Sequence, residues 1–216
     1  MKRLNDKKKM ARIIETLKGS VRSDCALEFD GDPWKLLVMA RLSAQCTDAR
    51  VNAVCRELFK KYPTAYDMAN AEITELEEAV RSCGLFRVKA ADIKAASAII
   101  CEKYGGSVPS DMASLLELPG VGRKIANLVR GDLFGLGGVV TDTHCIRICG
   151  RLGFYPETEK NPQKIEKILA PLVPTNEQTD LCHRLVWFGR DVCVARSPKC
   201  DECPLCNLCP YFLKRK

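Results

Sequence analysis

Apolar residues recur along most of the chain at spacings of three and four positions, which is the period of an amphipathic helix. Residues 8–18 show this pattern, with Met10, Ile13, Ile14 and Leu17 on one face. Residues 34–45 are apolar nearly all round and follow an Asp32-Pro33 helix start, so a buried helix is expected there. There is no internal repeat and no convincing alternating strand pattern. The sequence therefore predicts an all-α protein of about ten helices.

Two helical patterns between residues 110 and 134 are separated by a short turn that contains glycine. Ser110 is a good N-cap for the first pattern, and Pro119 cannot continue it. Gly120 and Gly122 permit backbone dihedrals that other residues avoid, and the second pattern starts beside Lys124. Such a hairpin directs unpaired backbone N–H groups outward at a helix N-terminus, which suits a phosphate group.

The composition favours an intracellular protein with a possible polyanionic partner. The 216 residues carry a formal net charge of +7, which permits such a partner without requiring one. The charged start lacks the apolar core of a signal peptide, and no apolar run reaches the length of a membrane span. The thirteen cysteines are therefore expected to be thiols or metal ligands in a reducing compartment, the cytoplasm.

The tail of the chain contains four cysteines separated by six, two and five residues: Cys193, Cys200, Cys203 and Cys209. Four thiolates within seventeen residues suit either a tetrahedral zinc site or an iron–sulfur cluster, and the spacing alone does not decide between them. Cys206 lies between two of these residues and is not expected to be a ligand.

The stretch from residue 118 to 144 contains LPGVGRK at its start and TDTH at its end, and it resembles the helix-hairpin-helix DNA glycosylases of the endonuclease III branch. The resemblance extends from about residue 32 to 209. It implies two helical lobes with a DNA-binding cleft between them. One would be residues 26–136, with the hairpin at about 111–134. The other would be 1–25 plus 137–216, and would hold a [4Fe–4S] cluster on the four spaced cysteines.

Lys124 and Asp142 match the family's catalytic lysine and aspartate in residue type, context and separation. The resemblance implies a bifunctional base excision repair enzyme that removes oxidised pyrimidines. Lys124 would attack C1′ of the sugar, form a Schiff base and cut the strand on the 3′ side by β-elimination. Asp142 would stabilise positive charge on the sugar, although capping the helix that follows would also explain this residue.

The resemblance further implies contacts with double-stranded DNA that carries damaged bases or abasic sites. The residues concerned are Gln45, Leu85, Gly120, Gly122, Arg196 and Lys199. Gln45 would enter the DNA near the vacated base position, and Leu85 would be a wedge in the base stack, unless it packs inward as part of a helix cap. The glycine amides would hold a phosphate. The two basic residues would contact phosphates, unless they are only solvated charges.

Two other classes compete with the enzyme. One is a DNA-binding hairpin module, which would need neither Lys124 nor Asp142. The other is an iron–sulfur electron carrier, but bacterial ferredoxins use tighter cysteine spacing than this chain has. Adenine-removing relatives lack the lysine, so Lys124 favours the bifunctional enzyme.

The N-terminal helix is expected to dock on the body rather than to act as a DNA-contacting arm. The expected protein is a prokaryotic, cytoplasmic monomer that associates with the nucleoid through DNA.

Overall fold

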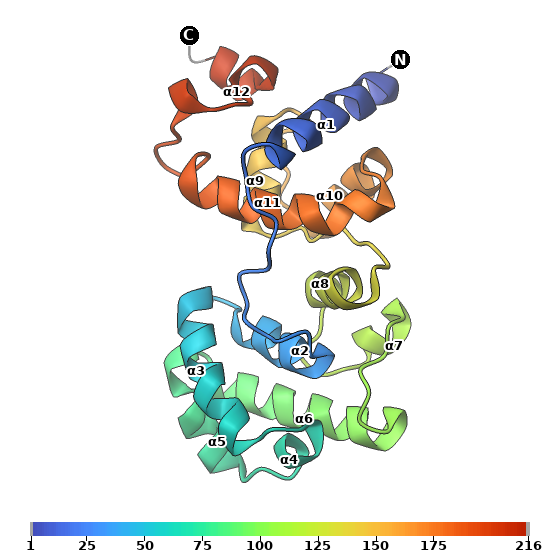
Figure 1. Ribbon diagram of the computed structural model, residues 1–216, viewed down its shortest axis with the longest axis vertical. Coiled ribbons are helices and arrows are strands. Elements are labelled where there is room, and N and C mark those ends of the chain that lie inside the picture. The colour runs from blue at the N-terminus through green and yellow to red at the C-terminus, as the bar shows by residue number, and fades with distance from the viewer. Residues whose placement is uncertain (1, 215–216) are drawn as a thin grey trace. The chain divides into compact units, whose positions relative to one another are not determined.

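The computed structural model describes residues 2–214, and these residues form twelve α-helices and five short 3₁₀ helices, with no β-strand (Figure 1). The all-α prediction is confirmed. The structure has more helices than the ten expected because some are very short. Helices α4 (Ala65–Ala69) and α12 (Pro210–Leu213) have five and four residues, too few to display a helical period in the sequence.

The chain divides into two compact units. Ala26–Phe134 form one unit, called the hairpin unit here, and Met1–Cys25 together with Gly135–Lys216 form the other, called the terminal unit. The sequence prediction set the second boundary after residue 136, two residues further along the chain. Each unit has its own buried apolar residues, as expected for separately packed cores.

The hairpin unit begins with the buried helix predicted after Asp32. Helix α2 (Pro33–Leu42) has seven buried residues, and the Asp32 carboxylate caps it by accepting from the Trp34 amide at 2.8 Å and the Lys35 amide at 3.2 Å. The remaining α-helices of the unit are α3 (Asp48–Lys61), α4, α5 (Ile73–Ala79), α6 (Phe86–Tyr104), α7 (Met112–Leu116) and α8 (Arg123–Phe134). Helix α6 packs against α2, α4 and α5, and α8 packs against α2 and α7 (Figure 1).

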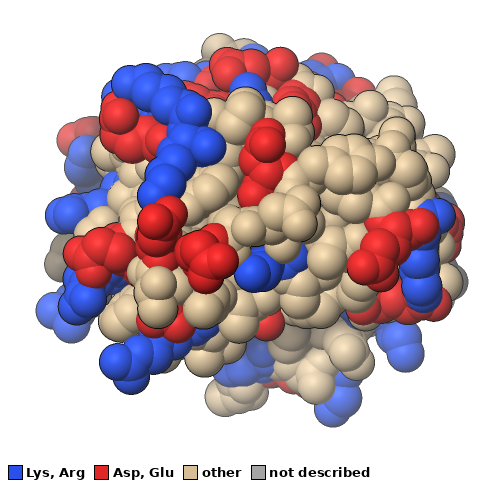
Figure 2. Space-filling view, turned by 90° about the horizontal axis from the view of Figure 1, so that it is seen from below, with Lys and Arg blue, Asp and Glu red and all other residues tan. Residues whose placement is uncertain are grey.

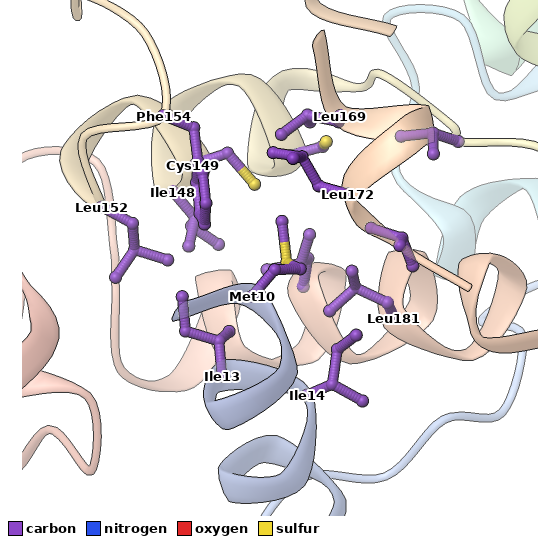
Figure 3. Packing of buried hydrophobic residues seen from close by; sticks show 14 of the residues in the cluster. Met10, Ile13, Ile14, Ile148, Cys149, Leu152, Phe154, Leu169, Leu172 and Leu181 are labelled. Carbon is purple, nitrogen blue, oxygen red and sulfur yellow. The ribbon is translucent and has the colours of Figure 1, made fainter. Parts of the chain in front are cut away.

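The terminal unit joins the first helix to the last third of the chain. Its α-helices are α1 (Lys2–Lys18), α9 (Thr143–Arg151), α10 (Pro162–Leu169), α11 (Gln178–Asp191) and α12. Met10, Ile13 and Ile14 of α1 point into a cluster that includes Ile148 and Leu181 (Figure 3). Full burial of one such side chain contributes about 1.5–3 kcal/mol. The predicted docking of α1 is therefore confirmed.

On the face shown in Figure 2, Lys and Arg side chains are interspersed with Asp and Glu side chains and with uncharged residues, so that face has no large patch of a single charge. Local ion pairs of this kind occur in the hairpin unit, for example Lys61–Glu75 and Arg81–Glu78, each at 2.7 Å. The net positive charge therefore does not by itself mark a binding surface on that face. None of the described helices combines the length and apolarity needed to cross a bilayer.

Candidate functional site

The predicted hairpin consists of α7, a tight turn and α8. Helix α7 is capped by Asp111, whose carboxylate accepts from the Ser114 amide at 2.9 Å. The expected cap, Ser110, was therefore wrong by one residue, because the helix begins at Met112 and Asp111 occupies the position before it. The Ser110 carbonyl accepts from Arg130 of α8 at 3.2 Å, which ties the segment before α7 to α8.

Gly120 fits the turn better than any residue with a Cβ would, for two reasons. Its φ of +74° lies in the left-handed region, and an added Cβ would lie 2.5 Å from Arg41 Nε and 2.7 Å from Asp92 Oδ2. Those two side chains form an ion pair with Nε and Oδ2 2.7 Å apart, and they come from α2 and α6. Gly122 differs, since its φ is not positive and a Cβ there would meet nothing within 4 Å. The expectation of unusual dihedrals is correct only for Gly120.

Gly120→Ala is expected to destabilise the hairpin unit by about 1–3 kcal/mol, because the new methyl group must displace the Arg41–Asp92 pair while φ stays positive. Thermal unfolding would measure the change. Gly122→Ala is the matched control, and its melting temperature should stay close to that of the wild type. Equal melting temperatures for the two variants would contradict the anchoring of the turn on this ion pair.

Lys124 is the second residue of α8 and its side chain is exposed. Ala126 and Val129, on the opposite side of the helix, are buried, and so is Asn127, one turn after Lys124. The first helical hydrogen bond runs from the Ala126 amide to the Gly122 carbonyl at 3.0 Å, so Lys124 lies in the first turn, at the positive end of the helix dipole. The fold thus presents a primary amine directly after the glycine turn.

Asp142 belongs to the terminal unit and is the N-cap of α9. Its Oδ1 accepts from the Cys145 amide at 2.7 Å, and its carbonyl accepts from the Ile146 amide at 2.9 Å. The side chain is half-buried. The capping role suggested by the sequence is therefore present, and it holds the carboxylate in one orientation.

Gln45 and Leu85 share an unusual backbone conformation in the hairpin unit. Their φ values are 56° and 47°, and Asp30 is the only other non-glycine residue with positive φ among residues 2–214. Both side chains are exposed, and Leu85 is 60% exposed, so the alternative in which Leu85 packs inward is wrong. The sequence contained no signal for these conformations, because neither glutamine nor leucine favours positive φ.

The cysteines of the tail converge on one small cavity in the terminal unit. Cys193, Cys200, Cys203, Cys206 and Cys209 all line it. The lining contains no carboxylate or imidazole and includes two basic residues, Arg151 and Lys199. A sulfur-only donor set with nearby positive charge suits an iron–sulfur cluster, whose thiolate ligands make the site negative. Burial raises the pKa of the Cys203 thiol to about 11, so metal binding must release protons.

Two arginines that the sequence analysis missed hold the loop between Cys193 and Cys200. Arg151 donates to Cys193 Sγ at 3.3 Å and to the carbonyls of Val194 and Ala195 at 2.9 and 2.7 Å. Arg147 donates to the Cys193 carbonyl at 3.1 Å. Both project from α9, four positions apart, a spacing that places them on one face of the helix.

The loop held by these arginines presents Arg196 and Lys199, and both side chains are exposed. The Lys199 amide donates to the Val192 carbonyl at 3.0 Å, which closes the loop on itself.

The candidate residues are divided between the two units. Gln45, Leu85, Gly120, Gly122 and Lys124 lie in the hairpin unit. Asp142, the cysteines, Arg196 and Lys199 lie in the terminal unit.

Comparison with known proteins identifies the family. Residues 38–175 match a family described as HhH-GPD superfamily base excision DNA repair protein. Endonuclease III of Bacillus subtilis (strain 168) is 43% identical over 193 residues, which are 89% of this chain and 87% of that protein. Endonuclease III of Synechocystis sp. is 45% identical over 187 residues, 86% of this chain and 84% of that protein. The chain belongs to the endonuclease III family.

The structural comparison agrees with this assignment to the endonuclease III family. The protein chain in a solved structure of a trapped endonuclease III–DNA covalent intermediate is 41% identical in sequence to this chain. The superposition covers 97% of this chain and 98% of that chain, with a TM-score of 0.90. Family membership confirms the predicted enzyme class, a base excision repair DNA glycosylase with abasic-site lyase activity. It also agrees with an iron–sulfur protein in general, in keeping with the cysteines around the cavity.

Proposed function

We propose that this protein removes oxidised pyrimidines from double-stranded DNA and cuts the strand on the 3′ side of the vacated site. The observation that carries the proposal is the exposed amine of Lys124 in the first turn of α8, directly after the glycine turn. It is supported by the 41% identity to the endonuclease III of a trapped covalent DNA intermediate. A primary amine is one of the nucleophiles that form covalent enzyme–substrate intermediates, and it is the one that gives a Schiff base.

Chemistry on a base requires that the nucleotide leave the stack, which costs a few kcal/mol. Gln45 and Leu85 are exposed and suited to occupy the space that the nucleotide leaves. The backbone amides of the hairpin, at Gly120 and Gly122, bind a phosphate near the lesion in this proposal, because amides at a helix N-terminus attract anions. Gly122 is open to solvent, so a phosphate oxygen can approach its backbone closely.

In the proposed reaction the deprotonated amine of Lys124 attacks C1′. Its lone pair forms the N–C1′ bond while the glycosidic bond breaks and the base leaves with the bonding electrons. The nitrogen then loses a proton, and the C1′–O4′ bond of the sugar ring breaks while O4′ takes up a proton, which gives the protonated Schiff base. Removal of a C2′ proton then expels the 3′ phosphate. Asp142 stabilises the positive charge that develops on the sugar, and its bond to the Cys145 amide orients the carboxylate.

We further propose that Cys193, Cys200, Cys203 and Cys209 hold a [4Fe–4S] cluster and that Cys206 is not a ligand. The cluster would fasten both ends of the loop 194–199, which Arg151 already holds from α9. Arg196 and Lys199 would then contact DNA phosphates from fixed positions. Such contacts set the register of a protein on DNA without reading its sequence.

The assignment of ligands predicts that replacing two cysteines of the same cavity will have different effects on iron content. Cys200→Ser is expected to lose the cluster's visible absorbance and most of its iron, because a serine hydroxyl replaces one of four thiolates. Cys206→Ser is the matched control, since Cys206 lines the same cavity, and it should keep both. Iron and sulfide analysis of the purified variants would measure the difference. Loss of iron in both variants would contradict the ligand assignment.

The proposed function is tested by incubating the protein with a duplex that contains a single thymine glycol, in the presence and absence of borohydride. The expected result is base release, a cut on the 3′ side, and a covalent protein–DNA adduct after reduction. Base release without an adduct would favour a monofunctional glycosylase. Intact DNA with binding preserved would overturn the proposed substrate class.

A further inference from the structure

Lys89 is a lysine with no solvent exposure, close to the start of α6. Its Nζ donates to three carbonyl oxygens, those of Leu42, Ala44 and Cys83, at 2.8, 2.7 and 2.7 Å. A lysine ammonium has three N–H donors and no acceptor, so these carbonyls match it completely. An unpaired buried ammonium would be very costly, so the group is tolerated because all its hydrogens have acceptors.

The three carbonyls belong to two segments that are distant in the sequence. Leu42 ends α2, and the Ala44 carbonyl belongs to the peptide unit directly before Gln45. Cys83 ends the 3₁₀ helix Arg81–Cys83, two residues before Leu85. The backbone amide of Lys89 also donates to the Leu85 carbonyl at 3.1 Å. One residue therefore binds the backbone beside both Gln45 and Leu85.

The segments that Lys89 links include two of the three non-glycine residues with positive φ among residues 2–214. A conformation of this kind costs on the order of 1 kcal/mol or more for a non-glycine residue and persists only where the surroundings enforce it. The bond to the Ala44 carbonyl orients the peptide plane that determines φ of Gln45. Removal of the ammonium would release that plane and leave the backbone free to relax.

We propose that Lys89 is a positioning residue that holds Gln45 and Leu85 as one rigid pair, so that both side chains enter the DNA together. The inference rests on the proposed function, in which these two side chains occupy the gap left by the damaged nucleotide. Lys89 itself touches no DNA, since it is wholly buried. Its contribution is preorganisation, which removes the cost of ordering two loops at the moment of binding.

The test compares Lys89→Met with Lys94→Met. Methionine keeps an unbranched apolar side chain that extends as far as the Cε position of lysine, and it lacks the ammonium group. Lys94 is a matched control because it lies on the same helix, is half-buried, and donates to a backbone carbonyl, that of Ala71, at 2.6 Å. The probe is a duplex with a stable abasic analogue beside 2-aminopurine, whose fluorescence rises when it is unstacked. Single-turnover excision of thymine glycol is measured in parallel.

Lys89→Met is expected to lose most of the 2-aminopurine signal and to excise the base about ten-fold to a hundred-fold more slowly, since small displacements of positioning groups cost this much. Borohydride trapping at a preformed abasic site, with saturating protein, should be retained because Lys124 is intact. Lys94→Met should match the wild type in all three measurements. If Lys89→Met does not fold, Lys89→Gln, which keeps two donors, is judged by the same criteria.

Two further variants separate failure of this inference from failure of the proposed function. If Gln45→Ala and Leu85→Ala both leave the 2-aminopurine signal unchanged, insertion of these side chains is wrong, and the positioning role falls with it. If they abolish the signal while Lys89→Met behaves like Lys94→Met, the positioning role is overturned and the proposed function stands.

Discussion

Lys124→Ala is expected to abolish the borohydride-trapped adduct and to lower single-turnover base release by about three orders of magnitude or more, as removal of a nucleophile does in other enzymes. The amine that forms the bond to C1′ is lost, and no hydroxyl or thiol replaces it. Because the Lys124 side chain is exposed, its removal should change the free energy of unfolding by less than about 0.5 kcal/mol. A gel-shift of the reduced adduct and thermal unfolding measure the two effects.

A suitable control for Lys124→Ala is another exposed lysine of the hairpin unit. Lys103 of α6 forms a surface ion pair with Glu117 at 3.0 Å, and such pairs contribute at most about 1 kcal/mol. Lys103→Ala should trap DNA as the wild type does. A persistent adduct in Lys124→Ala would show that a different amine attacks the sugar, and peptide mapping of the adduct would identify it.

Asp142→Asn is expected to reduce the rate of base release by about 10²–10³-fold while the melting temperature changes little. An asparagine carbonyl can still accept from the Cys145 amide, so the cap of α9 is kept and only the negative charge is lost. The charge is the part that stabilises the developing cation on the sugar, and losing one electrostatic contact of this kind typically costs that much. Single-turnover kinetics at saturating enzyme measure the chemical step.

Asp142→Ala separates the structural role from the chemical one. It removes the cap as well as the charge and should cost about 0.5–2 kcal/mol of stability beyond the loss of rate. If Asp142→Asn releases the base at the wild-type rate, the carboxylate serves only as a helix cap, and the proposed stabilisation of the sugar cation is wrong.

Most of the helical architecture could be predicted from local patterns. The Asp32-Pro33 start of α2, the apolar face of α1 and the glycine turn before α8 are all short-range features whose physical causes lie within a few residues. The prediction failed where two neighbouring residues compete for the same role. Ser110 and Asp111 are both good caps, and Asp111 takes this role because the helix begins at Met112.

The chemistry of the candidate site was also readable from the sequence, because it depends on residue types at characteristic separations. Lys124 after the turn, Asp142 before α9 and the role of the spaced cysteines were proposed through the resemblance to the endonuclease III branch, and family membership agrees with the enzyme class that this resemblance implied. Their individual roles remain predictions, and the variants described above test them one by one.

Only the tertiary structure shows which residues hold the backbone around the candidate site. Lys89 reads in the sequence as one more helical lysine, yet it is wholly buried and binds carbonyls 47, 45 and 6 positions away in the chain. Arg41 and Asp92 meet beneath Gly120, and Arg151 reaches the loop after Cys193. Local sequence determines helices because their hydrogen bonds are local. It does not determine which distant backbone carbonyls a long basic side chain will bind, because that depends on how the helices pack.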